Sequence, residues 1–144
     1  MSNCGLSGSL PPNLMEMRSL EKIDLSHNTL SGVIPIIWES SFLDGNHHLK
    51  QIDLSHNSLD GRNLEWTNAK MISEINLSYN SLSGPLPINM MGSHLSLQKL
   101  WINNNFFNGD FGPLRSMGRL EVLDVSSTEV YGAVPPKIMR SPGL

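Results

Sequence analysis

The chain has 144 residues, of which 39% are hydrophobic and 16% charged, and its formal net charge is −3. This composition fits one folded domain and gives no electrostatic basis for binding nucleic acid or an anionic membrane surface. The sequence contains no run of about 18 apolar residues, so it predicts no membrane-spanning helix. The first ten residues lack the basic and apolar regions of a signal peptide. The single cysteine, Cys4, cannot form an intrachain disulfide.

One sequence pattern, LxxLxLxxNxLxGxIP, repeats along the chain. A partial copy occupies residues 1–19, and five full copies follow at spacings of 29, 23, 25 and 23 residues. A repeat of this period predicts coils that stack, because one coil cannot bury its own apolar edge. We therefore expect a single domain over 1–144, with repeats that begin at Leu20, Leu49, Ile72, Leu97 and Leu120.

Each full copy contains an apolar pair two residues apart, which is the spacing of side chains on one face of a strand. Stacking of the coils then predicts a parallel sheet whose apolar residues point inward and whose intervening residues point outward. The expected inward pairs are Ile23 and Leu25, Ile52 and Leu54, Ile75 and Leu77, Leu100 and Ile102, and Leu123 and Val125.

Further along each copy, one apolar residue is expected to fill the core and one glycine to allow a tight bend. The apolar residues are Leu30, Leu59, Leu82, Phe107 and Val130, and the glycines are Gly32, Gly61, Gly84, Gly109 and Gly132.

The endings LSGSLP at Leu6–Pro11, LSGVIP at Leu30–Pro35 and LSGPLP at Leu82–Pro87 complete the pattern. With them the chain resembles the plant-type leucine-rich repeat family over essentially its whole length. The resemblance implies an α/β-class solenoid with a parallel sheet on the concave side and irregular or 3-10 segments on the convex side. An insertion between Pro35 and Leu49 and the altered segment from Gly61 to Met71 are expected to vary the convex or lateral side. Both ends break inside a repeat, so we expect a fragment of a longer solenoid.

A polar column accompanies the apolar ones. An asparagine amide can both donate and accept hydrogen bonds, so it can satisfy backbone groups where each strand turns inward. The family resemblance implies a ladder of such residues along the solenoid. Cys4 and Thr128 occupy the asparagine position of their own coils. We expect Cys4 to be buried there, and we expect Thr128 to make fewer hydrogen bonds than an asparagine. The predicted ladder is Cys4, Asn28, Asn57, Asn80, Asn105 and Thr128.

The segment IDLSHN, at Ile23–Asn28 and Ile52–Asn57, contains the residue types of a hydrolase triad. Asp24 and Ser26 are expected on the outer face about 7 Å apart, a geometry that does not suit a triad. His27 and His56 are expected about 4.8 Å apart on neighbouring coils, but neither Asn3 nor Tyr79 beside them is a good zinc ligand. Repeat membership explains these residues better, so we predict no catalytic residue, metal or cofactor.

The family resemblance implies that the outward face of the sheet is the partner-binding surface. Most of its residues, including Ser26, Ser55 and Ser78, are small and polar. Aromatic side chains on a polar surface are typical of interaction hot spots. The expected binding residues are His56, Glu74, Tyr79, Lys99, Trp101, Asn103 and Phe106.

The segment Asn76-Leu77-Ser78 is a glycosylation sequon on that face. The resemblance implies the ligand- or co-receptor-binding part of a plant receptor-like kinase or receptor-like protein, with any kinase in another part of a longer parent. The partner would be a peptide or protein at the outer face of the plasma membrane or in the apoplast. A secreted inhibitor of cell-wall-degrading enzymes remains an alternative. So does a cytosolic interaction protein, with cytoplasmic localisation if the chain is complete.

Overall fold

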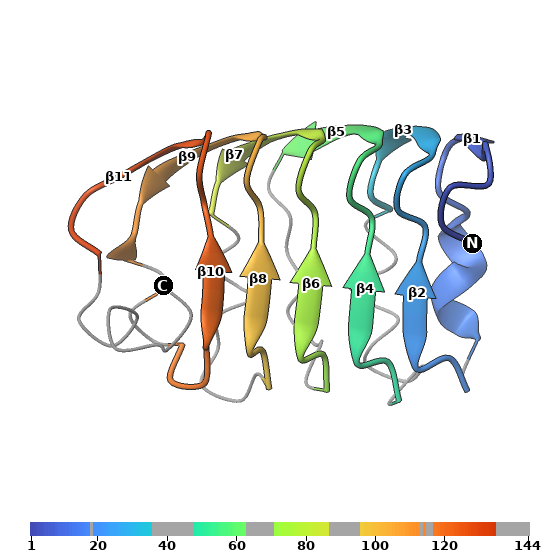
Figure 1. Cartoon of the computed structure of the whole chain (residues 1–144), viewed down its shortest axis with the longest axis horizontal. Helices are drawn as coiled ribbons and strands as arrows, with labels where there is room; N and C mark the ends of the chain where they lie inside the picture. The colour runs from blue at the N-terminus through green and yellow to red at the C-terminus, as the bar shows by residue number, and fades with distance from the viewer. Residues whose placement is uncertain are drawn as a thin grey trace.

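The computed structural model describes residues 1–17, 19–35, 48–62, 71–86, 96–112, 114 and 117–134. These residues form a solenoid of stacked coils with two parallel sheets (Figure 1). Three sequence features lie wholly or mostly outside the described residues. They are the insertion after Pro35, the altered segment that follows Gly61, and the end of the chain at Leu144.

The first sheet has five short strands, and we refer to it as the concave sheet. Its order is β10-β8-β6-β4-β2, and every pair is parallel (Figure 1). The middle residue of each strand is buried, whereas the residues on either side of it are partly or fully exposed. The predicted parallel sheet and its inward positions are therefore confirmed. The strands are β2 (Lys22–Asp24), β4 (Gln51–Asp53), β6 (Glu74–Asn76), β8 (Lys99–Trp101) and β10 (Val122–Asp124).

A second sheet follows the turn of each coil, and we refer to it as the lateral sheet. In Figure 1 it runs along the upper rim. The sequence predicts only core-filling residues and a bend here, but the chain forms a strand in each coil. The buried apolar residue lies between two outward residues, which is the alternation of a half-buried strand. The strands are β1 (Ser7–Gly8), β3 (Thr29–Val33), β5 (Ser58–Arg62), β7 (Ser81–Pro85), β9 (Phe106–Asp110) and β11 (Glu129–Tyr131).

The repeated glycine lies in or beside these lateral strands and has a positive φ in every coil, for example 126° at Gly61 and 107° at Gly109. Residues with a Cβ rarely adopt this conformation. At Gly61 a Cβ would also approach the Val33 side chain of the neighbouring coil to 3.5 Å. The glycine therefore permits both the backbone bend and the close packing of successive coils.

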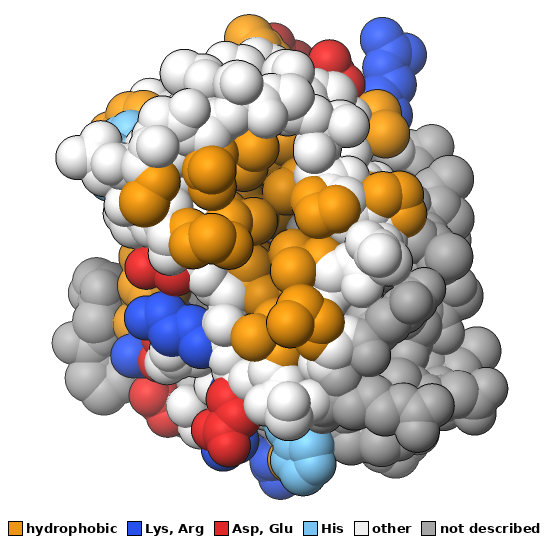
Figure 2. Space-filling model, turned by 90° about the vertical axis from the view of Figure 1, so that its right-hand side faces the viewer, with side chains coloured by type: hydrophobic (Ala, Val, Ile, Leu, Met, Phe, Trp, Pro, Cys, Tyr) orange, Lys and Arg blue, Asp and Glu red, His pale blue; other side chains and the backbone are white. Residues whose placement is uncertain are grey.

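The space between the two sheets holds one continuous hydrophobic core, which extends from Leu10 to Leu123. Seen from the β1 end, apolar side chains gather at the centre of the solenoid and polar atoms surround them (Figure 2). The 3-10 helix η1 (Pro12–Glu16) follows β1. In the part of the chain that the structure describes, no helix is long and apolar enough to cross a membrane.

Candidate partner-binding surface

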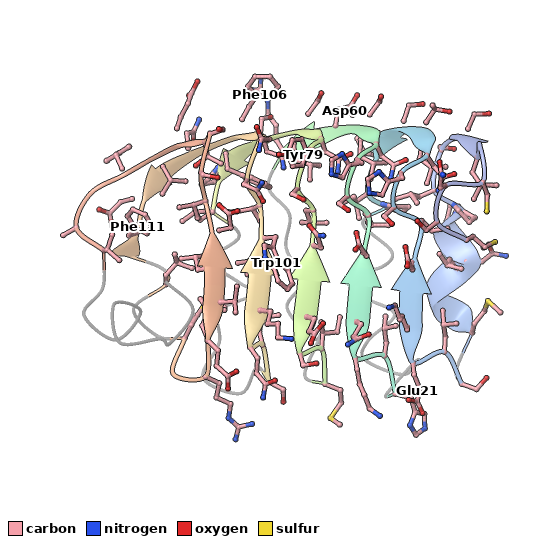
Figure 3. The ribbon with its side chains drawn as sticks, viewed as in Figure 1. Glu21, Asp60, Tyr79, Trp101, Phe106 and Phe111 are labelled. Atoms are coloured by element: carbon pink, nitrogen blue, oxygen red, sulfur yellow. The ribbon has the colours of Figure 1, made fainter. Side chains whose placement is uncertain are left out.

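Trp101 interrupts a column of carboxylate and amide side chains on the concave sheet. Register pairs the last residue of each strand with its equivalent in the next coil, so Trp101 lies between Asn76 on β6 and Asp124 on β10. The other members of the column are Asp24 and Asp53. Trp101 is partly exposed and lies on the face of the sheet (Figure 3). A large aromatic side chain is therefore presented where the other described coils have only small polar groups.

An ion pair borders Trp101 at the beginning of the strands. The Lys99 ammonium donates to the Glu74 carboxylate at 2.8 Å, across the β6–β8 pair. This hydrogen bond, together with the negative charge of Glu74, raises the pKa of Lys99. The two side chains remain 36% and 28% exposed, so a bound partner would meet this pair with most of its charge already neutralised.

The aspartate of each IDLSHN segment holds the serine two residues later. The Ser26 hydroxyl donates to Asp24 Oδ1 at 2.7 Å, and the Ser26 N–H donates to the same oxygen at 3.3 Å. The Asp53–Ser55 pair repeats this arrangement, with a hydroxyl bond of 2.6 Å. These bonds turn the serine inward, and Ser26 and Ser55 are only 6% and 3% exposed. The prediction that they face outward is therefore wrong.

This arrangement does not form a hydrolase triad. A nucleophilic serine must donate its proton to a histidine, but the Ser26 hydroxyl donates to a carboxylate and to no imidazole among its described contacts. The same bond lowers the pKa of Asp24, against the opposing effect of burial. The Asp-Leu-Ser segment therefore stabilises the turn that follows the strand.

Ser26→Ala is expected to destabilise the chain by about 1 kcal/mol near neutral pH and to raise the pKa of Asp24. Because the folded-state pKa of Asp24 is lowered, its contribution to stability is present above the usual value of 3.8 and is lost as the pH falls through the folded value. The difference between variant and wild type should therefore shrink in acid. NMR titration and urea unfolding measure both effects, with the exposed Ser81→Ala as control. An unchanged pKa of Asp24 would contradict this explanation.

A column of left-handed residues follows the concave strands, and we call it the shoulder column. All six members have φ between 53° and 55°, a conformation that costs most residues energy but suits asparagine. The column continues from coil to coil between the concave and the lateral sheets. Its members are Asn3, His27, His56, Tyr79, Asn104 and Ser127.

Three rings of the shoulder column form a stack. The ring centroids of His27 and His56 lie 4.1 Å apart and those of His56 and Tyr79 lie 4.2 Å apart, each pair at an interplanar angle of 12°. The predicted proximity of the two histidines on neighbouring coils is therefore confirmed. Parallel stacked imidazoles direct their nitrogen lone pairs side by side rather than toward one point, which does not suit a tetrahedral zinc site. Within the described ranges, no three metal-ligating side chains come together.

The predicted asparagine positions make the same hydrogen bonds in successive coils. Asn80 Oδ1 accepts from the Leu59 N–H of the preceding coil at 3.0 Å. Its Nδ2 donates to the carbonyl oxygens of Leu54, Leu77 and Ser78 at 3.0–3.2 Å. Equivalent bonds are made by Asn28, Asn57 and Asn105.

The two ends of this ladder differ from its middle. Cys4 is exposed, so the expectation that it is buried is wrong, because its coil lies at the end of the stack and has a neighbour only on the β3 side. Its thiol contacts the Ser2 carbonyl oxygen, and its N–H donates to Asn28 Oδ1. Thr128 makes one side-chain hydrogen bond, to the Val125 carbonyl oxygen, where each asparagine makes several.

The structure brings most of the predicted binding residues to one side of the solenoid. Tyr79 and Phe106 are 47% and 59% exposed and lie near the rim where each coil passes to the lateral sheet (Figure 3). His56 is also exposed, while Glu74, Lys99 and Trp101 are partly exposed on the concave sheet. Asn103 is the exception, with only 8% exposure. It occupies the position of the inward-turned serines, so the expectation that it faces outward is wrong.

Sequence reasoning missed the ring stack as a structural unit. The signal was present, because His27, His56 and Tyr79 occupy one position of the repeat in consecutive coils. Lateral-sheet residues such as Tyr131, which is 65% exposed, were also missed, since the pattern predicts no second sheet.

Asn76, the predicted glycosylation site, lies on the concave sheet within a hydrogen-bond network. Its Oδ1 accepts from the Ser78 hydroxyl at 2.7 Å, and its Nδ2 donates to Asp53 Oδ2 at 3.3 Å. It pairs in register with Trp101. A glycan at Asn76 would therefore stand beside Trp101.

Family models described as leucine-rich repeats match residues 19–41, 45–62 and 71–92. Receptor-like protein 39 of Arabidopsis thaliana is 30% identical over 96% of this chain. Among solved structures, a complex of the plant peptide hormone receptor RGFR1 with RGF2 matches 94% of this chain and 21% of that chain, with a TM-score of 0.79 and 28% identity. The Arabidopsis receptor kinase HAESA, in complex with the peptide hormone IDA and the co-receptor SERK1, gives a TM-score of 0.77 and 32% identity over 90% of this chain and 21% of that chain.

This chain spans 13% of the length of the curated relatives that it matches. The stacked parallel coils, the asparagine hydrogen bonds, the family-model matches and the receptor relatives agree on one assignment. The chain belongs to the leucine-rich repeat proteins of the plant receptor type.

Proposed function

We propose that the concave sheet binds a peptide or protein, as the ligand- or co-receptor-binding part of a plant receptor involved in signalling. The observation that carries the proposal is Trp101, an aromatic side chain on the sheet face in a column that is otherwise made of Asp and Asn. Aromatic anchors within a polar surface are typical of protein interaction hot spots. Recognition of this kind needs no reacting group, and we propose no catalysis for this chain.

The solved relatives support this proposal. RGFR1 is in complex with RGF2, and HAESA is in complex with IDA and SERK1, so proteins of this fold bind peptides and co-receptors. The described coils share one hydrophobic core, which supports a single domain over residues 1–144 with the repeat boundaries predicted from the sequence. We propose that the sheet faces the outside of the cell, as the receptor relatives suggest.

The probe is a peptide selected from a synthetic library by its binding to the immobilised chain. Trp101→Ala is expected to weaken its binding by about 30-fold, because loss of an aromatic anchor costs about 2 kcal/mol. Calorimetry measures the affinity, and circular dichroism checks the fold. Tyr131→Ala is a matched control, since Tyr131 is exposed on the lateral sheet. Trp101→Asn gives a second test, because Asn76 shows that the column accepts asparagine. Peptides that bind both Trp101 variants as tightly as the wild type would refute the proposal.

Asn76 is proposed as a glycosylation site when the protein passes through the secretory pathway. The expected result is a glycan mass on secreted wild-type protein that is absent from the Asn76→Gln variant, as measured by intact mass spectrometry. Because Asn76 neighbours Trp101, removal of the glycan should also increase peptide affinity. A secreted wild-type chain that carries no glycan would contradict the assignment.

A further inference from the structure

The ring stack on the shoulder column ends at Tyr79 and leaves one ring face open. His56 covers the Tyr79 face toward the preceding coil at a centroid distance of 4.2 Å. The opposite face therefore looks toward the next coil, where Asn104 occupies the equivalent position with nearly the same φ, 53° against 55°. Tyr79 remains 47% exposed. A fourth ring of the stack would lie in the space above Asn104, which has no ring of its own. We call this space the next step of the stack.

The residues around this step are suited to contact with a partner. Asn104 is partly exposed, and its side-chain amide makes no hydrogen bond with the other described residues, although its backbone N–H and carbonyl are both bonded. Phe106, two residues further on, is 59% exposed and adds an apolar wall on the same coil. Tyr79 thus provides a ring face, Asn104 a carbonyl acceptor and Phe106 an apolar side.

The charge around the step favours a cation. Glu129 is the only Asp, Glu, Lys or Arg among the described residues of the shoulder column and the first positions of β3, β5, β7, β9 and β11. In the lateral register it pairs with Asn108, two residues after Phe106. Glu129 is exposed. The described lysines Lys22, Lys50 and Lys99 lie at or just before the beginnings of concave strands, at the opposite end of those strands from the shoulder column. Arg62, at the end of β5, lies two strands away from Phe106 in the lateral register. A positive group above Asn104 would therefore meet the negative face of the Tyr79 ring, with the Glu129 carboxylate on the coil that follows.

We propose that this step binds an arginine side chain of the partner, stacked on the open face of Tyr79. A guanidinium is planar, so it fits the spacing of about 4 Å that the stack already has, and it stacks on aromatic faces. Its N–H groups can donate to Asn104 Oδ1. A lysine ammonium has the charge without the plane, and a partner aromatic ring has the plane without the charge. The inference rests on the proposed function, because it identifies part of the ligand for the same recognition surface.

The test uses short blocked tripeptides, Gly-X-Gly, in an NMR titration. With X as arginine, the side-chain protons next to the guanidinium should shift upfield and saturate, because they lie over the Tyr79 ring. Lysine, citrulline and phenylalanine are the comparisons, and each should bind at least about three-fold more weakly. Equal affinity for lysine would mean unspecific charge attraction, and tighter binding of phenylalanine would mean an aromatic occupant; either result overturns the proposal.

Two variants locate the binding and one serves as control. Tyr79→Asn removes the ring but keeps a residue that suits a left-handed backbone, as Asn3 and Asn104 do. Asn104→His fills the step with the residue found at positions 27 and 56. Both should abolish the arginine shift, whereas His27→Asn, at the far end of the stack, should keep it. Retention of the shift in both Tyr79→Asn and Asn104→His would refute the site.

This outcome is separable from failure of the proposed function. The tripeptide reports on the shoulder alone, whereas the selected peptide reports on recognition by the concave sheet. A missing arginine shift together with Trp101-dependent peptide binding refutes only the arginine step. A normal arginine shift together with Trp101-independent binding refutes only the concave-sheet proposal.

Discussion

Replacing Asn105 with alanine is expected to destabilise the chain by about 3 kcal/mol, because two buried backbone groups lose their partners. The Asn105 Oδ1 accepts from the Leu82 N–H at 3.0 Å, and Leu82 is fully buried. The Asn105 Nδ2 donates to the Ile102 carbonyl oxygen at 3.2 Å. In the next coil Thr128 bonds within its own coil and offers no replacement.

Urea unfolding measures this loss. Asn108→Ala is the matched control, because Asn108 is the same residue type three positions later but exposed on β9. The control should cost less than about 0.5 kcal/mol. Asn105→Asp provides a second comparison, since it retains an acceptor for Leu82 but loses the donor, and it should also be strongly destabilising. Equal stability of Asn105→Ala and Asn108→Ala would contradict a supporting role for the ladder.

Phe107→Ala is expected to cost about 3–5 kcal/mol, because Phe107 is fully buried and its removal leaves a large cavity between the sheets. Phe107 is among the largest fully buried side chains in the described ranges. Most of the equivalent positions hold a leucine, as at Leu59 and Leu82. The neighbouring coils therefore cannot compensate for so large a loss of volume.

Phe107→Leu is the control, since it restores the residue type of the other coils. It should cost about 1 kcal/mol, much less than alanine. Chemical unfolding monitored by far-ultraviolet circular dichroism gives both values. A loss below about 1 kcal/mol for Phe107→Ala would show that the lateral half of the core contributes little, against the packing described above.

The sequence predicted the concave sheet because one physical requirement determines it. Pairs such as Ile52 and Leu54 recur at the repeat period, and only stacked parallel strands bury all of them. The lateral sheet was missed because its strands contain one core residue each, flanked by serine, glycine and aspartate. Those residues are more typical of turns. The coils of this solenoid stack closely enough to pair them nevertheless, as at β5 and β7.

The proposed binding surface was predicted less completely. Register in the repeat placed Tyr79, Trp101 and Phe106 on the accessible side, since each follows from the position of the inward residues. It could not show that Asn103 turns inward, because that depends on the backbone conformation after the strand. The exposure of Cys4 likewise depends on its place at the end of the stack, whereas the repeat pattern treats every coil alike.

The central claim is that the partner lies on the concave sheet. Carbodiimide labelling of carboxylates tests it most directly, because acidic residues lie on both sheets. Asp53 and Asp124 belong to the Trp101 column, whereas Asp60 and Asp110 lie on the lateral strands. With the selected peptide bound, we expect labelling of Asp124 and Asp53 to fall while Asp60 and Asp110 are labelled as before. Protection of Asp60 and Asp110, with Asp124 and Asp53 unchanged, would contradict the claim.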